Sequence, residues 1–190
     1  MGVCLKQRVT VAVCGVQRGA GVTNFCISLL RYIRVSLNKR ALIIDCSETK
    51  ELFRARKDNM GIYLQAGIEV LNCSDPDAYS QAADGYDFLI LDLGADYKGH
   101  EREFYCSDKR YILGNVGICK RDAFHRFLSS NIPLNMRDEK ICFLTAAGQK
   151  AQAREFEKNE KIRVWVMPFI DNPLKVDKCS YGFFQEVFNN

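Results

Sequence analysis

Residues 11–24 have the sequence VAVCGVQRGAGVTN, in which an apolar run leads through a glycine-rich turn into the start of a helical pattern. A strand, such a turn and a helix N-terminus together place backbone N–H groups where they can bind phosphate. Glycine suits the turn because it adopts positive φ angles and lets a ligand approach the backbone closely. The same glycines also suit a tight strand-to-helix turn that binds nothing, so the stretch alone leaves both interpretations open.

The rest of the sequence alternates between short apolar runs and segments with helical spacing. The runs predict strands, and the spacing predicts helices between them. Strand then helix, repeated, is typical of parallel strands joined by right-handed crossovers. We therefore predict an α/β fold with a mostly parallel central sheet and helices on both faces. The predicted strands are 9–14, 40–45, 68–71, 87–92, 110–113, 140–144 and 162–166, and the predicted helices are 24–37, 49–57, 77–83, 120–130 and 148–159.

Two of the predicted strands end in an aspartate. Asp45 and Asp92 each close a nearly continuous apolar run, the pattern expected when helices cover both faces of a sheet. In an open parallel sheet, ligands bind at the carboxyl ends of the strands. We therefore expect the functional residues to gather around 15–24, 45–50 and 92–97.

Length and charge limit the classes of function. The chain has 190 residues, which fits a single domain over 1–190, and no repeat or linker-like stretch divides it. The net charge is +4, too small an excess to hold a nucleic acid at physiological salt by itself. Basic residues between 98 and 126 are interleaved with acidic ones, which favours a mixed solvated surface. Nucleic acid is thus a possible partner that the charge does not support.

Cysteine usage and hydropathy indicate a compartment. The nine cysteines are scattered singly with no C-x-x-C pair, so no zinc site is predicted and a reducing, cytoplasmic location is expected. No run approaches the roughly 18 apolar residues that suggest a membrane span. At the C-terminus, Phe183, Phe184, Val187 and Phe188 recur at helical spacing, and we expect them to pack on the sheet rather than to contact a membrane.

Aligned without gaps, the glycine-rich turn resembles the deviant P-loop of the ParA/MinD family of partitioning and positioning ATPases. Gly19 and Gly21 match loop glycines, and Thr23 matches the hydroxyl that holds magnesium in that family. The resemblance implies a site for ATP or ADP with Mg²⁺. It implies that the residues around the phosphates are Gln17, Arg18, Gly19, Ala20, Gly21, Val22, Thr23 and Asn24.

The resemblance extends to three later segments. Residues 38–45 are similar to the family's second strand, with Asp45 as its terminal aspartate, and 85–94 are similar to its Walker B strand and switch, with Asp92 in the matching place. Residues 164–169 resemble the late strand and the loop near the nucleotide base. These matches imply catalytic roles for Asp45 and Asp92 and a magnesium site at Thr23 and Asp92.

The departures from the family pattern concern charge. Val22 stands where the P-loop lysine is expected, and Gln17 stands where the family has its signature lysine. A valine supplies no charge to the phosphates, and phosphoryl transfer depends on such charge neutralisation. Arg18 follows the signature position, where it could fold onto a phosphate, point to solvent or meet a partner acid.

Three hypotheses follow. The first is a degenerate ParA/MinD-like P-loop protein, a nucleotide-binding or pseudo-NTPase positioning or partitioning module that acts through a protein partner or a homodimer. The second is a slow Mg²⁺-dependent ATPase that uses Arg18 in place of the missing lysine. The third is a scaffold without a nucleotide site, which would follow if Val16 and Val22 filled the phosphate cavity.

Overall fold

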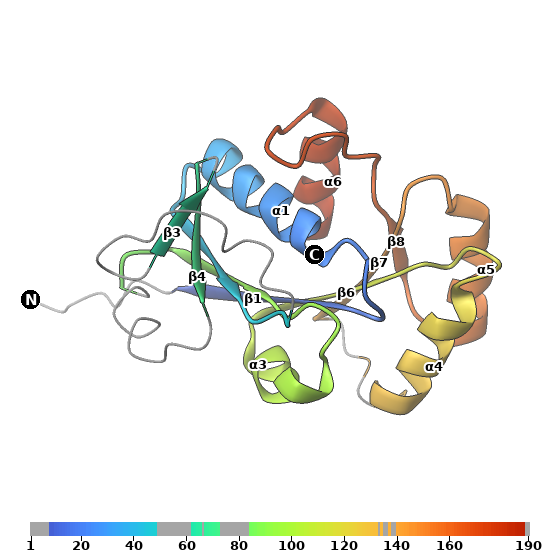
Figure 1. Ribbon diagram of the computed structural model, residues 1–190. Helices are drawn as coiled ribbons and strands as arrows, with labels where there is room; N and C mark the ends of the chain where they lie inside the picture. The colour runs from blue at the N-terminus through green and yellow to red at the C-terminus, as the bar shows by residue number, and fades with distance from the viewer. Residues whose placement is uncertain are drawn as a thin grey trace, which may run out of the picture.

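The computed structural model describes residues 8–48, 62–65, 67–72, 84–132, 134, 137 and 140–188. Within these residues, the strands form one sheet in the order β3-β4-β2-β5-β1-β6-β7-β8 (Figure 1). All neighbours in the sheet pair in parallel except β3, which pairs antiparallel with β4 at one edge. The strands are β1 Val9–Gly15, β2 Ala41–Asp45, β3 Ile62–Gln65, β4 Ile68–Asn72, β5 Phe88–Asp92, β6 Lys109–Gly114, β7 Ile141–Thr145 and β8 Val164–Val166.

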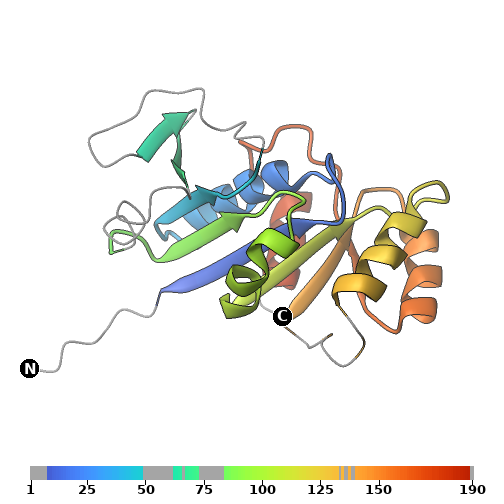
Figure 2. The same ribbon diagram turned by 60° about the horizontal axis from the view of Figure 1, so that its bottom comes forward.

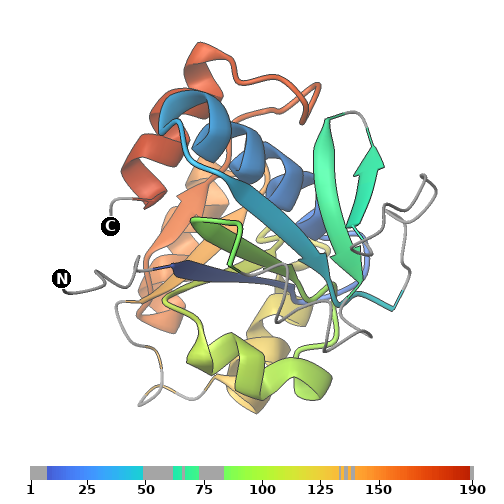
Figure 3. The ribbon, with the colours of Figure 1, turned by 90° about the vertical axis from the view of Figure 1, so that its left-hand side faces the viewer.

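Helices cover both faces of the sheet, as predicted (Figure 3). Because side chains alternate along a strand, β1 sends Val11 and Val13 into the core under α1 and α6, and it sends Ala12 and Cys14 into the core over α3, α4 and α5. The fold is therefore a three-layer α/β arrangement with two hydrophobic cores. The helices are α1 Val22–Ser36, the 3₁₀ turn η1 Lys98–His100, α3 Glu101–Cys106, α4 Arg121–Asn131, α5 Lys150–Glu160 and α6 Lys178–Phe188.

The strand predictions are confirmed within one or two residues at most ends, and β3 is the strand that the sequence did not predict. The predicted helices 24–37, 120–130 and 148–159 are confirmed as α1, α4 and α5. The predicted helices 49–57 and 77–83 lie outside the described residues. The short helix α3 was not predicted.

The C-terminal aromatic side chains pack inward, as expected. Phe184, Val187 and Phe188 of α6 are buried in the core shared with α1. Phe184 lies 5.5 Å from Phe25 of α1, measured between ring centroids. In the described part of the chain, no helix has both the length and the apolar character needed to cross a membrane.

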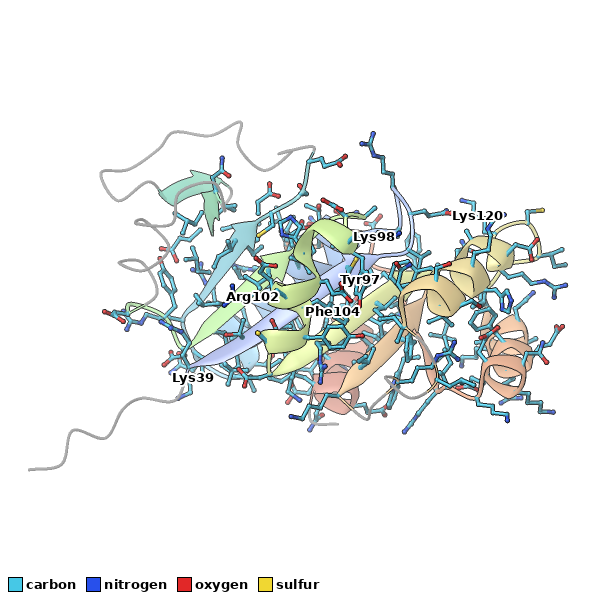
Figure 4. All side chains as sticks on the ribbon, turned by 90° about the horizontal axis from the view of Figure 1, so that it is seen from below. Lys39, Tyr97, Lys98, Arg102, Phe104 and Lys120 are labelled. Atoms are coloured by element: carbon cyan, nitrogen blue, oxygen red, sulfur yellow. The ribbon has the colours of Figure 1, made fainter. Side chains whose placement is uncertain are left out.

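The basic residues between 98 and 126 do not gather into one patch. Lys98 and Arg102, from the segment containing η1 and α3, are separated in Figure 4 from Lys120 at the start of α4. Arg121 forms an ion pair with Glu155 at 3.2 Å. This arrangement agrees with the mixed charged surface that the sequence indicates.

The sheet order decides which loops meet. Strand β1 lies between β5 and β6 (Figure 2), and β2 lies on the far side of β5. Asp45 and Asp92 are register partners at the carboxyl ends of β2 and β5. The loops that follow β1, β2 and β5 therefore emerge side by side at the same edge of the sheet.

Candidate functional site

A cavity of about 710 Å³ lies at the carboxyl ends of β1, β2 and β5. Its wall contains all eight predicted loop residues, 17–24, together with Ser47, Glu48, Gly94, Ala95 and Asp96. The volume is within the usual range for small-molecule sites. The structure thus brings together the three segments in which we expected the functional residues.

The backbone of the loop leaves room for a ligand. Gly19 has a φ of 75° and Gly21 a φ of 92°, and a Cβ on either residue would meet no atom within 4 Å. Gly21 is also the N-cap of α1, and no side chain caps this helix end. The first N–H groups of a helix lack partners within the helix. The start of α1 therefore offers hydrogen-bond donors, and a favourable dipole, at the cavity wall.

Thr23 connects the loop to the end of β5. Its hydroxyl donates a hydrogen bond of 2.7 Å to Oδ2 of Asp92, whose Oδ1 accepts one of 3.0 Å from the Gly94 N–H. Asp92 is fully buried. The Thr23 hydroxyl therefore faces a carboxylate instead of capping α1. Hydroxyl and carboxylate oxygens are suitable ligands for Mg²⁺, so this pair fits the ion that the sequence implied.

Val22, which the sequence resemblance aligns with the P-loop lysine, does not fill the cavity. It is buried in the core under α1, and its Cγ2 would lie 2.9 Å from a Cβ placed on Gly15. Val16 packs against the core on the opposite face of the sheet and is not among the residues that line the cavity. The apolar side chains thus leave the cavity open, but they contribute no positive charge to it.

Asp45 makes local contacts at the end of β2. Its Oδ1 accepts hydrogen bonds from the Ser47 N–H at 2.9 Å and from the Ser47 hydroxyl at 2.5 Å. This is the pattern of an Asx turn, which stabilises the chain reversal after a strand. Asp45 is buried behind Ser47 and does not line the cavity, so its catalytic role stays a prediction.

Of the charged side chains at the cavity that the structure describes, two are acidic and one is basic. Arg18 forms an ion pair with Glu48, so of the three alternatives for Arg18 the structure shows the partner acid. Asp96 also lines the cavity, and its Oδ1 accepts a hydrogen bond of 3.0 Å from the Gly99 N–H. Burial, reinforced by the charges of Asp96 and Asp92, raises the pKa of the Cys14 thiol to about 12. Among the wall residues that the structure describes, an anionic ligand would meet the carboxylates of Glu48 and Asp96 and the guanidinium of Arg18.

Sequence analysis missed Glu48, Ala95 and Asp96 as individual residues of the wall. The signal that could have found them is their place directly after β2 and β5, inside segments already expected to contain functional residues. The segment 164–169 forms β8 and the loop after it, but it does not line this cavity, and Phe169 is exposed. Among the described residues, no three His, Cys, Asp or Glu side chains are grouped to hold a metal ion.

Comparison with known proteins gives matches in structure alone. No protein-family model matches the sequence, and no curated protein matches it. A ParA family ATPase from Chlorobium tepidum superimposes with a TM-score of 0.65 at 12% identity, covering 97% of this chain and 94% of that one. The MinC:MinD complex from Aquifex aeolicus matches with a TM-score of 0.60 at 13% identity, over 86% and 82%.

A nucleotide-bound relative matches equally well. The septum site-determining protein MinD from Pyrococcus horikoshii, complexed with Mg-ADP, has a TM-score of 0.59 at 12% identity, over 93% of this chain and 86% of that one. These identities are low, but the superpositions cover 86–97% of this chain and 82–94% of the others. The chain therefore has the P-loop fold of the ParA and MinD ATPases.

Proposed function

We propose that this protein is a ParA/MinD-like nucleotide-binding module that acts through association with a protein partner or a second copy of itself, and that it hydrolyses nucleotide poorly. The observation that carries the proposal is the 2.7 Å hydrogen bond between Thr23 and Asp92 at an open P-loop cavity. The ligand is ATP or ADP with Mg²⁺. The positioning or partitioning role is what the sequence resemblance implies, and one solved structure with this fold is named as a septum site-determining protein.

Nucleotide binding is supported by the wall of the cavity. Backbone N–H groups of the glycine loop and of the start of α1 can donate hydrogen bonds to phosphate oxygens, and Thr23 with Asp92 can hold the magnesium that would accompany them. One solved structure with this fold is named as a complex with Mg-ADP. Since Val16 and Val22 leave the cavity open, binding is favoured over the scaffold hypothesis.

Poor hydrolysis is supported by the missing charge. Phosphoryl transfer depends on groups that stabilise the charge on the transferred phosphoryl. Losing one preorganised donor typically lowers turnover by about a hundred- to a thousandfold. Val22 supplies no positive charge in place of the lysine. Bound Mg²⁺, when present, would neutralise part of the phosphate charge.

Thermal melting of the purified protein tests the binding proposal. Samples contain millimolar ATP, ADP, GTP or no nucleotide, each with Mg²⁺ or with a chelator. A ligand that binds only the folded state at about a hundredfold excess over Kd stabilises it by about 2.7 kcal/mol. We expect a Mg²⁺-dependent rise in melting temperature with ATP and ADP. The absence of any shift would exclude nucleotide binding and favour the scaffold hypothesis.

Two further measurements test turnover and association. Phosphate release from Mg-ATP should not exceed that of an Asp92→Asn control, and release clearly above it would favour the slow ATPase. Sedimentation velocity, with and without Mg-ATP, tests for a homodimer. If the protein stays monomeric in both conditions, the association must be with a different protein.

A further inference from the structure

The ion pair between Arg18 and Glu48 joins two sides of the cavity. Arg18 belongs to the loop after β1, and Glu48 follows the end of β2. Both residues line the cavity, and both side chains are largely exposed, at 78% and 59%. The pair therefore lies in solvent at the wall of the site, where an incoming anion can compete for the guanidinium.

Among the wall residues that the structure describes, Arg18 is the one with a positively charged side chain. The described wall otherwise comprises one Glu, one Asp and uncharged residues. Arg18 is therefore the described side chain that can bring positive charge to the phosphates. In the structure, the Arg18 guanidinium already forms an ion pair with Glu48.

We infer that Glu48 is an autoinhibitory group, which holds Arg18 on itself and releases it to the phosphates when a nucleotide binds. The inference rests on the proposed nucleotide site and adds a control on its affinity. A guanidinium can make a bidentate contact with a phosphate as well as with a carboxylate, and the nucleotide phosphates carry more negative charge than Glu48, so the exchange is favoured. Exposed ion pairs are weak, so the exchange is feasible and breaking the pair should change affinity by about two- to fivefold.

Equilibrium titration with Mg-ADP can separate this role from simple charge repulsion. The variants are Glu48→Gln and Asp96→Asn, each made alone and together with Arg18→Gln. Asp96 is the matched control, because it lines the same cavity with the same charge but accepts its hydrogen bond from the Gly99 backbone.

We expect Glu48→Gln to tighten Mg-ADP binding about two- to fivefold, with the gain lost when Arg18→Gln is also present. Asp96→Asn should give a similar change whether or not Arg18 is present, since it removes charge without freeing Arg18. A gain from Glu48→Gln that persists in the Arg18→Gln background would overturn the inference, and so would the absence of any gain.

A nucleotide-free measurement distinguishes the failure of this inference from the failure of the proposed function. In ¹⁵N NMR spectra of the protein alone, the Arg18 side-chain resonance should shift in Glu48→Gln and stay unchanged in Asp96→Asn. If the Arg18 side-chain resonance has the same chemical shift in Glu48→Gln as in the wild type, the inference is refuted even if nucleotide binds. An ion pair seen by NMR, with no Mg-ADP binding in any variant, refutes both the proposed function and the inference.

Discussion

Cγ2 of Val22 lies so close to Gly15 that a Cβ on that glycine would be 2.9 Å away. This contact joins the first residue of α1 to the last residue of β1. The side chain at the P-loop lysine position is thus used for packing. Substitutions at position 22 test directly whether a positive charge there changes the affinity for nucleotide.

Replacing Val22 with lysine should strengthen binding of Mg-ADP. A charged hydrogen bond contributes about 1.5–3 kcal/mol, which corresponds to a gain in affinity of about ten- to a hundredfold. Val22→Met is the control, because methionine has a long unbranched side chain without the charge. Titration calorimetry with Mg-ADP compares the two variants, and equal affinities would show that charge at this position does not limit binding.

Removing the Thr23 hydroxyl should uncouple nucleotide binding from magnesium. In Thr23→Val, Asp92 loses a donor while it stays buried, so the free energy of unfolding should fall by about 1–3 kcal/mol. The shift in melting temperature with Mg-ADP should then be the same with and without the chelator.

Ser28→Ala is the matched control for this variant. Ser28 also lies in α1 and is buried, but its hydroxyl bonds to the Asn24 carbonyl at 2.9 Å within the helix. Its loss should leave the magnesium dependence intact. If Thr23→Val retained the dependence of the wild type, Thr23 would have no role in holding the ion.

A buried ion pair connects α5 to the chain after α4. Nη1 of Arg137 donates to the Glu160 carbonyl at 2.6 Å and lies 3.4 Å from Glu160 Oε2, and Nε donates to the Ile132 carbonyl at 2.9 Å. Arg137→Met should lower the free energy of unfolding by about 1–3 kcal/mol, because the buried Glu160 loses the guanidinium but keeps its ion pair with His125. Adding Glu160→Gln should recover part of the loss in urea denaturation. A double variant no more stable than Arg137→Met would contradict this explanation.

Asp177 should contribute to a fall in the melting temperature as the pH is lowered. Hydrogen bonds from the Ser180 N–H and hydroxyl, at 2.7 and 2.8 Å, lower the pKa of this carboxyl from its ordinary value of 3.8. A group whose pKa is lower in the folded state stabilises the fold above its unfolded pKa, and this contribution is lost as the pH falls through the folded value. Asp177→Asn should therefore show a smaller drop in melting temperature than the wild type between about pH 5 and pH 2.

Overlapping profiles for Asp177→Asn and the wild type would show that the hydrogen bonds from Ser180 to Asp177 do not contribute to the acid sensitivity.

The sequence predicted the parallel strands because their side chains are buried on both faces. β1, β2 and β5 are almost wholly apolar, so they show no alternation of apolar and polar residues. Only the residues before and after each apolar run set the strand apart from the segments around it. The short helix α3 has six residues, of which Phe104 alone is buried. Three of the others are charged, so the sequence shows no apolar repeat with helical spacing. The edge strand β3 has four residues and pairs on one side only, so its formation depends on β4 rather than on its own pattern.

The place of the candidate site was predictable, but its charge balance was not. Parallel pairing places the ends of β1, β2 and β5 together, which is enough to predict where the loop and Asp92 meet. The partner of Arg18 depends on the path of the chain after Asp45. That path brings Glu48, 30 residues away, to the guanidinium, and no local pattern in the sequence signals this pairing.

The central position of β1 also determines when the phosphate loop can form during synthesis. Strand β1 is made before both of its neighbours, residues 88–92 on one side and 109–114 on the other. Synthesis must reach residue 92 before the first neighbour is complete and residue 114 before the second, and non-local pairing of this kind is slow. The loop therefore takes its final shape late, and until then the apolar β1 is open to aggregation.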